Sequence, residues 1–178
     1  MLLSRPAIEG FFEGGSTMKS FMRIVMLAVL LTVVLLPLPA RAADAKDPLH
    51  GDWQLNVARS TFQPGPGPKG QLRSYRISNG VEKLTARGVS ADKMPTLVRY
   101  EARYDGKDYD ITGSTGGDKI SLRRIDALTT ESTQKRNGKA AIITTRKVSP
   151  DGKTLTVTAK GTVPDGQTLD SVMIFDRH

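Results

Sequence analysis

The chain has 178 residues, no cysteine, two histidines and a net charge of +8. The absence of cysteine excludes a fold held together by disulfide bonds and a lipoprotein acylated on cysteine. The composition also argues against catalysis by an activated thiol or a buried histidine, because the chain has no cysteine and only His50 and His178. The excess of basic residues favours contact with anionic ligands or surfaces and says nothing about fold.

The N-terminal region carries the features of an export signal. Residues 1–17 do not resemble the start of a signal peptide, which indicates that Met18 is the natural start and the leading segment a mis-called extension. Beyond Met18, Lys19 and Arg23 precede the apolar run IVMLAVLLTVVLL over 24–36. This run is shorter than the roughly 20 residues that cross a bilayer as a helix. It therefore suits the apolar core of a signal peptide.

A processing site follows the apolar run. Pro37 breaks any helix there, and Ala40 and Ala42 place small residues where signal peptidase needs them. We predict a signal peptide over 18–42 that is cleaved after Ala42, with Ala45 as a second site. An uncleaved membrane anchor is the alternative. Cleavage would deliver the protein to the periplasm or the medium, with no transmembrane segment in the mature chain.

The remaining 136 residues suit a single domain with one core. Residues 1–42 hold four basic and two acidic residues, so the mature chain has a net charge of +6. We expect residues 43–50 to form a flexible N-terminus and residues 51–178 to form the domain.

Tight-turn signals dominate the mature sequence. Asn-Gly and Asp-Gly dipeptides tolerate the positive φ of hairpin turns, and weaker breaks fall at 91–95, 116–117 and 126–127. The dipeptides are Asn79-Gly80, Asp105-Gly106, Asn137-Gly138, Asp151-Gly152 and Asp165-Gly166. Eight turns separate nine strands, and a first strand around Trp53 makes ten.

Between the turns, residues alternate with a period of two. In TLVRYEARYD, apolar or aromatic side chains at 98, 100, 102 and 104 alternate with charged ones at 99, 101, 103 and 105. This pattern is typical of strands with one buried face. The related segments DGKDYDIT (105–112) and DGKTLTVT (151–158) suggest a repeated hairpin. We predict an all-β, antiparallel up-and-down meander of about ten strands that closes into a barrel and so removes its edges.

The start of the mature chain resembles known families. Gly51-x-Trp53-x-Leu55 followed by a meander is similar to the lipocalin and fatty-acid-binding (calycin-type) barrels. More specifically, GDWQLNVARSTFQPGPGPK looks like the opening of uncharacterised exported bacterial proteins with the pattern GxWxLNxxxSxFxPGP. The lipocalin resemblance implies that Trp53 plugs the narrow end of a barrel and packs against the last strand.

Two features depart from the lipocalin and fatty-acid-binding pattern. Fatty-acid-binding proteins carry a two-helix lid after the first strand, whereas Pro64, Pro66 and Pro68 favour an extended polyproline path and forbid helix here. Lipocalins carry a C-terminal helix, whereas this chain ends in the strand-like DSVMIFDRH. A barrel with a packed interior therefore stays open as an alternative.

The inward faces supply the candidate ligand-binding residues. Strand alternation places arginines and tyrosines among small apolar side chains, where a guanidinium could pair with a carboxylate or phosphate. The candidates are Arg73, Tyr75, Tyr100, Tyr104, Tyr109, Arg124 and Arg146. The strand over 128–136 also offers Leu128, Thr130, Ser132 and Gln134 inward. The alternative is that the arginines lie at strand ends and reach solvent, and that the tyrosines are ordinary core residues.

Other motifs give no site. Asp44, Asp47, His50 and Asp52 could ligate a metal but fit a solvated tail better. The segment over 114–118, STGGD, lacks the Gly-Lys-Ser/Thr of a phosphate loop and fits a turn. The scattered charge and few aromatics do not favour nucleic-acid binding. We predict no catalytic residues, no metal site and no cofactor.

These observations favour an exported carrier or sensor of a small amphipathic or anionic molecule. The alternative is an interaction protein with a solid barrel, whose basic surface or PGPGP segment contacts an envelope protein, lipopolysaccharide or a protease. A carboxylate-based enzyme ranks third. Replacing Arg73 and Arg146 with methionine separates the first two, because only the carrier should lose acid binding.

Overall fold

The computed structural model describes residues 46–178. The predicted signal peptide, its predicted cleavage sites and the predicted leading extension lie outside these residues. Ten strands follow one another without a helix: β1 (Gly51–Thr61), β2 (Gly70–Ser78), β3 (Val81–Val89), β4 (Pro95–Arg103), β5 (Tyr109–Thr112), β6 (Lys119–Arg124), β7 (Thr129–Arg136), β8 (Lys139–Val148), β9 (Thr154–Thr162) and β10 (Thr168–Arg177). Within the described residues, no helix is long and apolar enough to cross a membrane.

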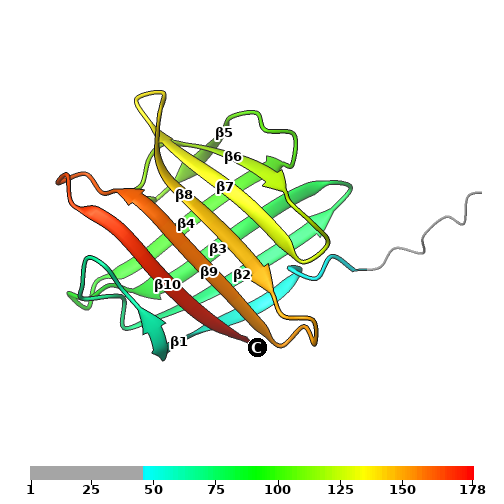
Figure 1. Cartoon of the computed structure of the whole chain (residues 1–178), viewed down its shortest axis with the longest axis horizontal. Helices are drawn as coiled ribbons and strands as arrows, with labels where there is room; N and C mark the ends of the chain where they lie inside the picture. The colour runs from blue at the N-terminus through cyan, green and yellow to red at the C-terminus, as the bar shows by residue number, and fades with distance from the viewer. Residues whose placement is uncertain (1–45) are drawn as a thin grey trace, which may run out of the picture. The chain divides into compact units, whose positions relative to one another are not determined.

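The ten strands form a closed antiparallel barrel. Each strand pairs with the next in sequence, and β1 pairs with β10, where Leu55 lies opposite Phe175. In Figure 1 the wall formed by β7–β10 crosses in front of the wall formed by β1–β4. The all-β fold, the meander order, the strand number and the closure expected from the sequence are confirmed.

The hairpin turns follow the local chemistry of their residues. Asn79 and Asn137 adopt φ of 50° and 51°, and each precedes a glycine that also has positive φ. Such pairs match the right-handed twist of the flanking strands. At the Asp-Gly turns only the glycine has positive φ, and the aspartate side chain instead accepts a backbone hydrogen bond two residues on, as Asp151 does from Lys153.

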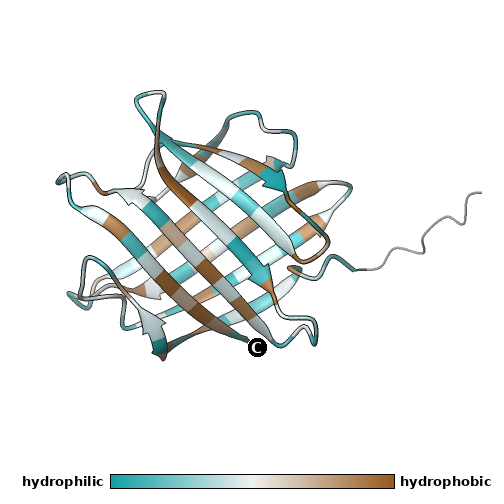
Figure 2. Cartoon of the chain, in the orientation of Figure 1, coloured by the Kyte–Doolittle hydropathy of each residue, from teal (hydrophilic) through white to brown (hydrophobic). Residues whose placement is uncertain are grey.

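The alternation along each strand separates the interior from the surface. Figure 2 shows hydrophobic and hydrophilic bands alternating along the strands. The inward positions also change in size along the barrel axis. On β9 they run Leu155, Val157, Ala159 and Gly161 from one end of the barrel to the other. The interior is therefore filled at one end and hollow at the other.

Candidate functional site

The hollow end of the barrel contains a cavity of about 520 Å³. Inward side chains from nine of the ten strands line it, together with the loops over 62–69, 90–94 and 113–118. These loops all lie at the end of the barrel remote from Trp53. The interior is thus not solid, and its volume falls within the ~300–1,000 Å³ of typical ligand pockets.

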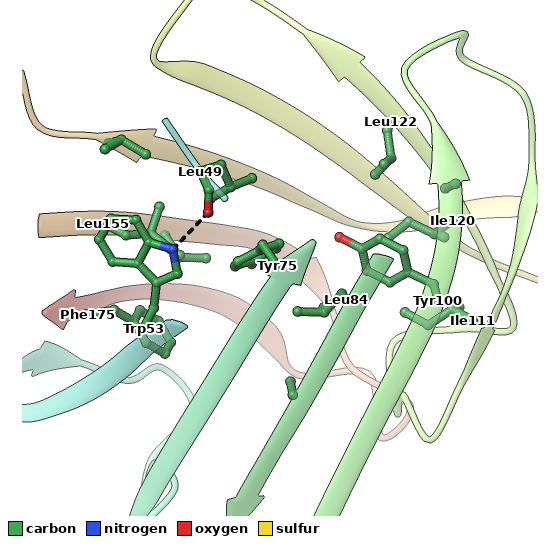
Figure 3. Close-up of a cluster of buried hydrophobic side chains, with 14 of the residues drawn as sticks. Leu49, Trp53, Tyr75, Leu84, Tyr100, Ile111, Ile120, Leu122, Leu155 and Phe175 are labelled. Atoms are coloured by element: carbon green, nitrogen blue, oxygen red, sulfur yellow. Dashed lines mark hydrogen bonds between the residues drawn. The ribbon is translucent and has the colours of Figure 1, made fainter. Parts of the chain in front are cut away.

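The opposite end is closed by Trp53. Its ring is fully buried, and its Nε1–H donates to the backbone oxygen of Leu49 at 2.9 Å (Figure 3). Phe175 and Leu155 are also buried in this cluster, and the guanidinium carbon of Arg177 lies 4.1 Å from the centre of the indole. Trp53 pairs directly with Arg177 of β10. Trp53 thus lies at the closed end of the barrel, against the last strand.

Residues 46–50 pack against this closed end instead of extending as a tail. Leu49 is buried, and Asp47 forms a salt bridge with Arg124. The backbone N–H of Ile77 donates to Nδ1 of His50 at 3.1 Å. Of the residues that the sequence suggested as a metal cluster, Asp47, His50 and Asp52 are therefore engaged separately, Asp52 with Arg76, and Asp44 lies outside the described residues. Among residues 46–178, no group of three or more His, Cys, Asp or Glu side chains could hold a metal ion.

A buried ionic network separates the closed end from the cavity. Glu82 is fully buried on β3, and its Oε1 accepts a 2.5 Å hydrogen bond from Nη1 of Arg146 on β8. The hydroxyls of Tyr100 and Tyr104 also donate to the Glu82 carboxylate. Nη1 of Arg146 donates in addition to the Tyr100 hydroxyl at 2.8 Å. Glu82 thereby fixes one edge of the Arg146 guanidinium.

The network changes the pKa values of its tyrosine and arginine side chains. Burial is the main cause that raises the pKa of the Tyr100 hydroxyl well above its ordinary value, and the nearby Glu82 carboxylate adds to the effect. The pKa of Tyr104 rises for the same reasons. Burial is the largest single effect and would lower the pKa of Arg146, but the combined attraction of Glu82 and the neighbouring tyrosines outweighs it, so the pKa is raised. Both tyrosines therefore stay protonated and Arg146 stays charged around neutral pH.

The other edge of the Arg146 guanidinium is unpartnered. The side chain is 2% exposed, and neither Nε nor Nη2 has a hydrogen-bond partner. These two nitrogens form the side of the guanidinium that fits the two oxygens of a carboxylate. Thr130 lies directly opposite Arg146 on β7, and its buried Oγ1 also lacks a partner. Arg146 lines the cavity, but these two nitrogens are themselves buried, so an anion in the cavity reaches them only when the side chains that cover them move.

Arg73 is the second cation of the cavity. Its Nε donates to the side chain of Gln71 at 2.7 Å, and its guanidinium stacks 4.7 Å above the ring of Phe175. Among the described residues it forms no salt bridge with a carboxylate. Glu82 balances Arg146, whereas Arg73 has no carboxylate partner within the described part of the chain; the one carboxylate that lines the cavity, Asp92, lies in the loop at the mouth.

The segment over 62–69 lies across the mouth of the cavity. Phe62 and Pro66 both line it. The backbone of Gln63 is fixed to β10, because its N–H and carbonyl both bond the Ser171 hydroxyl and the carbonyl also accepts the N–H of Asp170. Residues 63–65 form a bend, so the path is not the extended polyproline one expected from the sequence.

Position 67 in this segment requires a glycine. A Cβ added there would lie 2.2 Å from the Phe62 ring. The aromatic ring and the glycine backbone are therefore in direct contact, and a larger residue would displace Phe62 from the mouth.

The structure distributes the seven candidate binding residues over four places. Arg73, Tyr75, Tyr100 and Arg146 line the cavity. The other three do not: Tyr104 belongs to the network around Glu82, Arg124 pairs with Asp47 and stacks on Tyr104, and Tyr109 donates to Asp105 on the surface.

Glu82 was missed by the sequence reasoning. Its spacing from Leu84 and Ala86 already places it on the inward face of β3. A buried carboxylate there predicts a buried cation elsewhere in the interior, and this signal would have singled out Arg146.

The segment over 114–118 is a turn in which the Gly116 N–H donates to the Ser114 hydroxyl.

Comparisons with known proteins give limited context. The chain matches no protein-family model and no curated protein sequence. Among solved structures, it is similar to zebrafish ileal bile acid-binding protein complexed with cholic acid, with a TM-score of 0.48 and 12% sequence identity over 74% of this chain and 99% of that chain. A similarity at this level carries no argument about function.

Proposed function

We propose that the barrel binds one small amphipathic anion inside its cavity, with the anionic group paired to the free edge of Arg146. The carrying observation is that Arg146, a buried guanidinium whose side chain lines the cavity, leaves Nε and Nη2 without a hydrogen-bond partner. Buried donors without partners are rare in proteins, and a carboxylate is their best-matched acceptor.

The charge of the interior supports a monoanion. Arg146 is neutralised by Glu82, whereas Arg73 has no carboxylate partner among the described residues. One negative charge on a ligand would therefore balance the inner part of the cavity, away from Asp92 at the mouth. In the low-dielectric interior such balance matters more than it does at the surface.

The remaining walls suit an apolar body. Leu84, Ala86, Val98 and Ile111 line the side of the cavity formed by β3–β5, and Phe62 lies at the mouth. Burial of a hydrocarbon chain against these side chains adds roughly 0.8 kcal/mol for each CH₂ group. A cation at the inner end and apolar groups towards the mouth together favour a ligand with a single charged head.

A role in the cell follows from the N-terminal sequence. We infer that the protein is exported, after cleavage near Ala42, and serves as a carrier or sensor in the periplasm or medium. The GxW opening and the closed ten-strand meander support a calycin-type binding protein. A surface contact with an envelope partner remains compatible with this role, because ligand and partner would use different faces. No arrangement of side chains described above favours an enzyme.

The proposal is tested with decanoate as the probe, by isothermal titration and native mass spectrometry of the purified protein. We expect one decanoate per barrel. Arg73→Met should weaken binding, and the pair Glu82→Gln with Arg146→Met should weaken it about tenfold or more, because a charge-assisted hydrogen bond is worth roughly 1.5–3 kcal/mol. The paired change avoids leaving a buried carboxylate without its cation.

Arg123→Met is the matched control. Arg123 faces outward beside Arg124 and pairs with Glu131 on the surface, so decanoate affinity should stay unchanged. Absence of any bound decanoate, or equal affinity of the control and the Arg146 variant, would overturn the proposal.

A further inference from the structure

Two hydroxyl side chains lie next to Arg146 on the way to the mouth. Ser132 on β7 and Thr144 on β8 are cross-strand partners, as Thr130 and Arg146 are one step further in. Ser132 is 5% exposed and Thr144 8% exposed, and both line the cavity. Their exposure to the cavity, and not to bulk solvent, makes them polar groups that a ligand would cover.

The hydroxyl pair gives the cavity two chemically different walls. On the wall formed by β7–β10, the row that contains Ser132 and Thr144 continues through Ala159 to Ser171, all small side chains. On the opposite wall the cavity meets Leu84 and Val98. A ligand that fills the cavity therefore has this row of small, mostly hydroxyl-bearing side chains on one side, and on the other side apolar side chains with Arg73 and Thr96 among them.

A plain hydrocarbon chain fits this wall poorly. Covering a hydroxyl without giving it a partner costs free energy, whereas an oxygen on the ligand replaces the lost hydrogen bonds. Thr144 comes two residues before Arg146 on β8 and lies nearer the mouth of the cavity. Two residues along a strand correspond to about 7 Å. The complementary ligand carries an oxygen at about this distance from its anionic group.

We propose that Ser132 and Thr144 determine specificity, and that the cavity selects acids with a hydroxyl or oxo group part-way along an otherwise apolar body. This inference rests on the proposed function, because the position of the oxygen is measured from an anion held at Arg146. It adds a ligand class that the arginines alone do not define.

The test compares decanoate with monohydroxydecanoates that carry the hydroxyl at successive carbons. We expect affinity to peak for a mid-chain hydroxyl, about threefold to tenfold above that of decanoate, as one net hydrogen bond allows. In the Ser132→Ala, Thr144→Val double variant the peak should disappear while decanoate binds at least as well as before. Thr145→Val, which alters the outward neighbour on β8, should keep the peak.

The outcomes separate the two proposals. If decanoate binds but affinity falls steadily or stays flat with hydroxyl position, the specificity inference is wrong and the anion site stands. A peak that survives in the double variant also overturns the inference. If neither decanoate nor any hydroxy acid binds, the proposed function itself fails.

Discussion

The two ends of the barrel are built from the same ten strands but are filled differently. At the closed end, Trp53, Leu155 and Phe175 are fully buried and leave no space. At the other end, β9 contributes Ala159 and β3 contributes Ala86 to the lining of a cavity of about 520 Å³. The comparison teaches that side-chain size at inward positions, and not strand topology, decides where the barrel is core and where it is a container.

The largest expected effect concerns the closed end. Trp53→Ala should lower the free energy of unfolding by about 3–5 kcal/mol, because it empties the packed end and removes the hydrogen bond to Leu49. Urea denaturation followed by far-UV circular dichroism measures the loss, and Trp53→Phe should lose less. A loss below about 1 kcal/mol for the alanine variant would show that this end does not hold the barrel together.

Breaking the Glu82–Arg146 ion pair, which lies between the two ends, should lower the free energy of unfolding almost as much. Glu82→Leu leaves Arg146 buried without its carboxylate, which costs about 3–5 kcal/mol of stability in comparable cases. Adding Arg146→Met should recover at least half of that loss, since the second change removes the unpaired charge. If the double variant is no more stable than Glu82→Leu, the ion pair is not what connects β3 and β8 across the interior.

A change at the hollow end should affect binding and leave stability nearly intact. Ala159→Leu adds a side chain into existing space, so the free energy of unfolding should change by no more than about 1 kcal/mol. Decanoate affinity should fall at least tenfold because the ligand loses that volume. Thr158→Leu, on the outward face of β9, should change neither quantity much. Unchanged affinity in Ala159→Leu would mean that decanoate does not occupy this cavity.

The smallest expected effect appears only at alkaline pH. Tyr100 and Tyr104 have raised pKa values in the folded protein, whereas an unfolded tyrosine titrates near 10. The folded state therefore holds more protons above pH 10, and stability is complete below that value and declines as pH rises above it. Tyrosinate absorbance and circular dichroism should report this decline together. Full ionisation of all four tyrosines near pH 10 in the folded protein would contradict the buried network.

Strand number, turns and inward faces could be predicted because they depend on local rules. Turn dipeptides and period-two alternation are readable without knowing which strands meet. The departure of residues 63–65 from an extended path was not readable, because the bonds that fix Gln63 come from Ser171 and Asp170, more than a hundred residues away. Likewise, residues 46–50 look like a polar tail in sequence but are held by Arg124 and Ile77.

The sequence predicted that arginines lie on the inward faces of the strands, but it did not predict which carboxylate pairs with each arginine. Alternation placed Arg73, Arg124 and Arg146 on the inward faces, yet their roles depend on which carboxylate each one meets. Arg124 meets Asp47 and Arg146 meets Glu82, while Arg73 meets none among the described residues. Such pairings join residues that are distant in sequence, so only the closed barrel reveals that Arg146 keeps one edge free.

The most direct test of the account observes the Arg146 guanidinium itself. The arginine Nε–Hε resonances can be followed by NMR during titration with decanoate, with the Arg146 signal assigned from its absence in the Glu82→Gln, Arg146→Met variant. The account predicts that this signal shifts and saturates at one equivalent, while the Arg123 signal stays unchanged. An Arg146 signal that does not move at saturating decanoate would contradict an anion site inside the barrel.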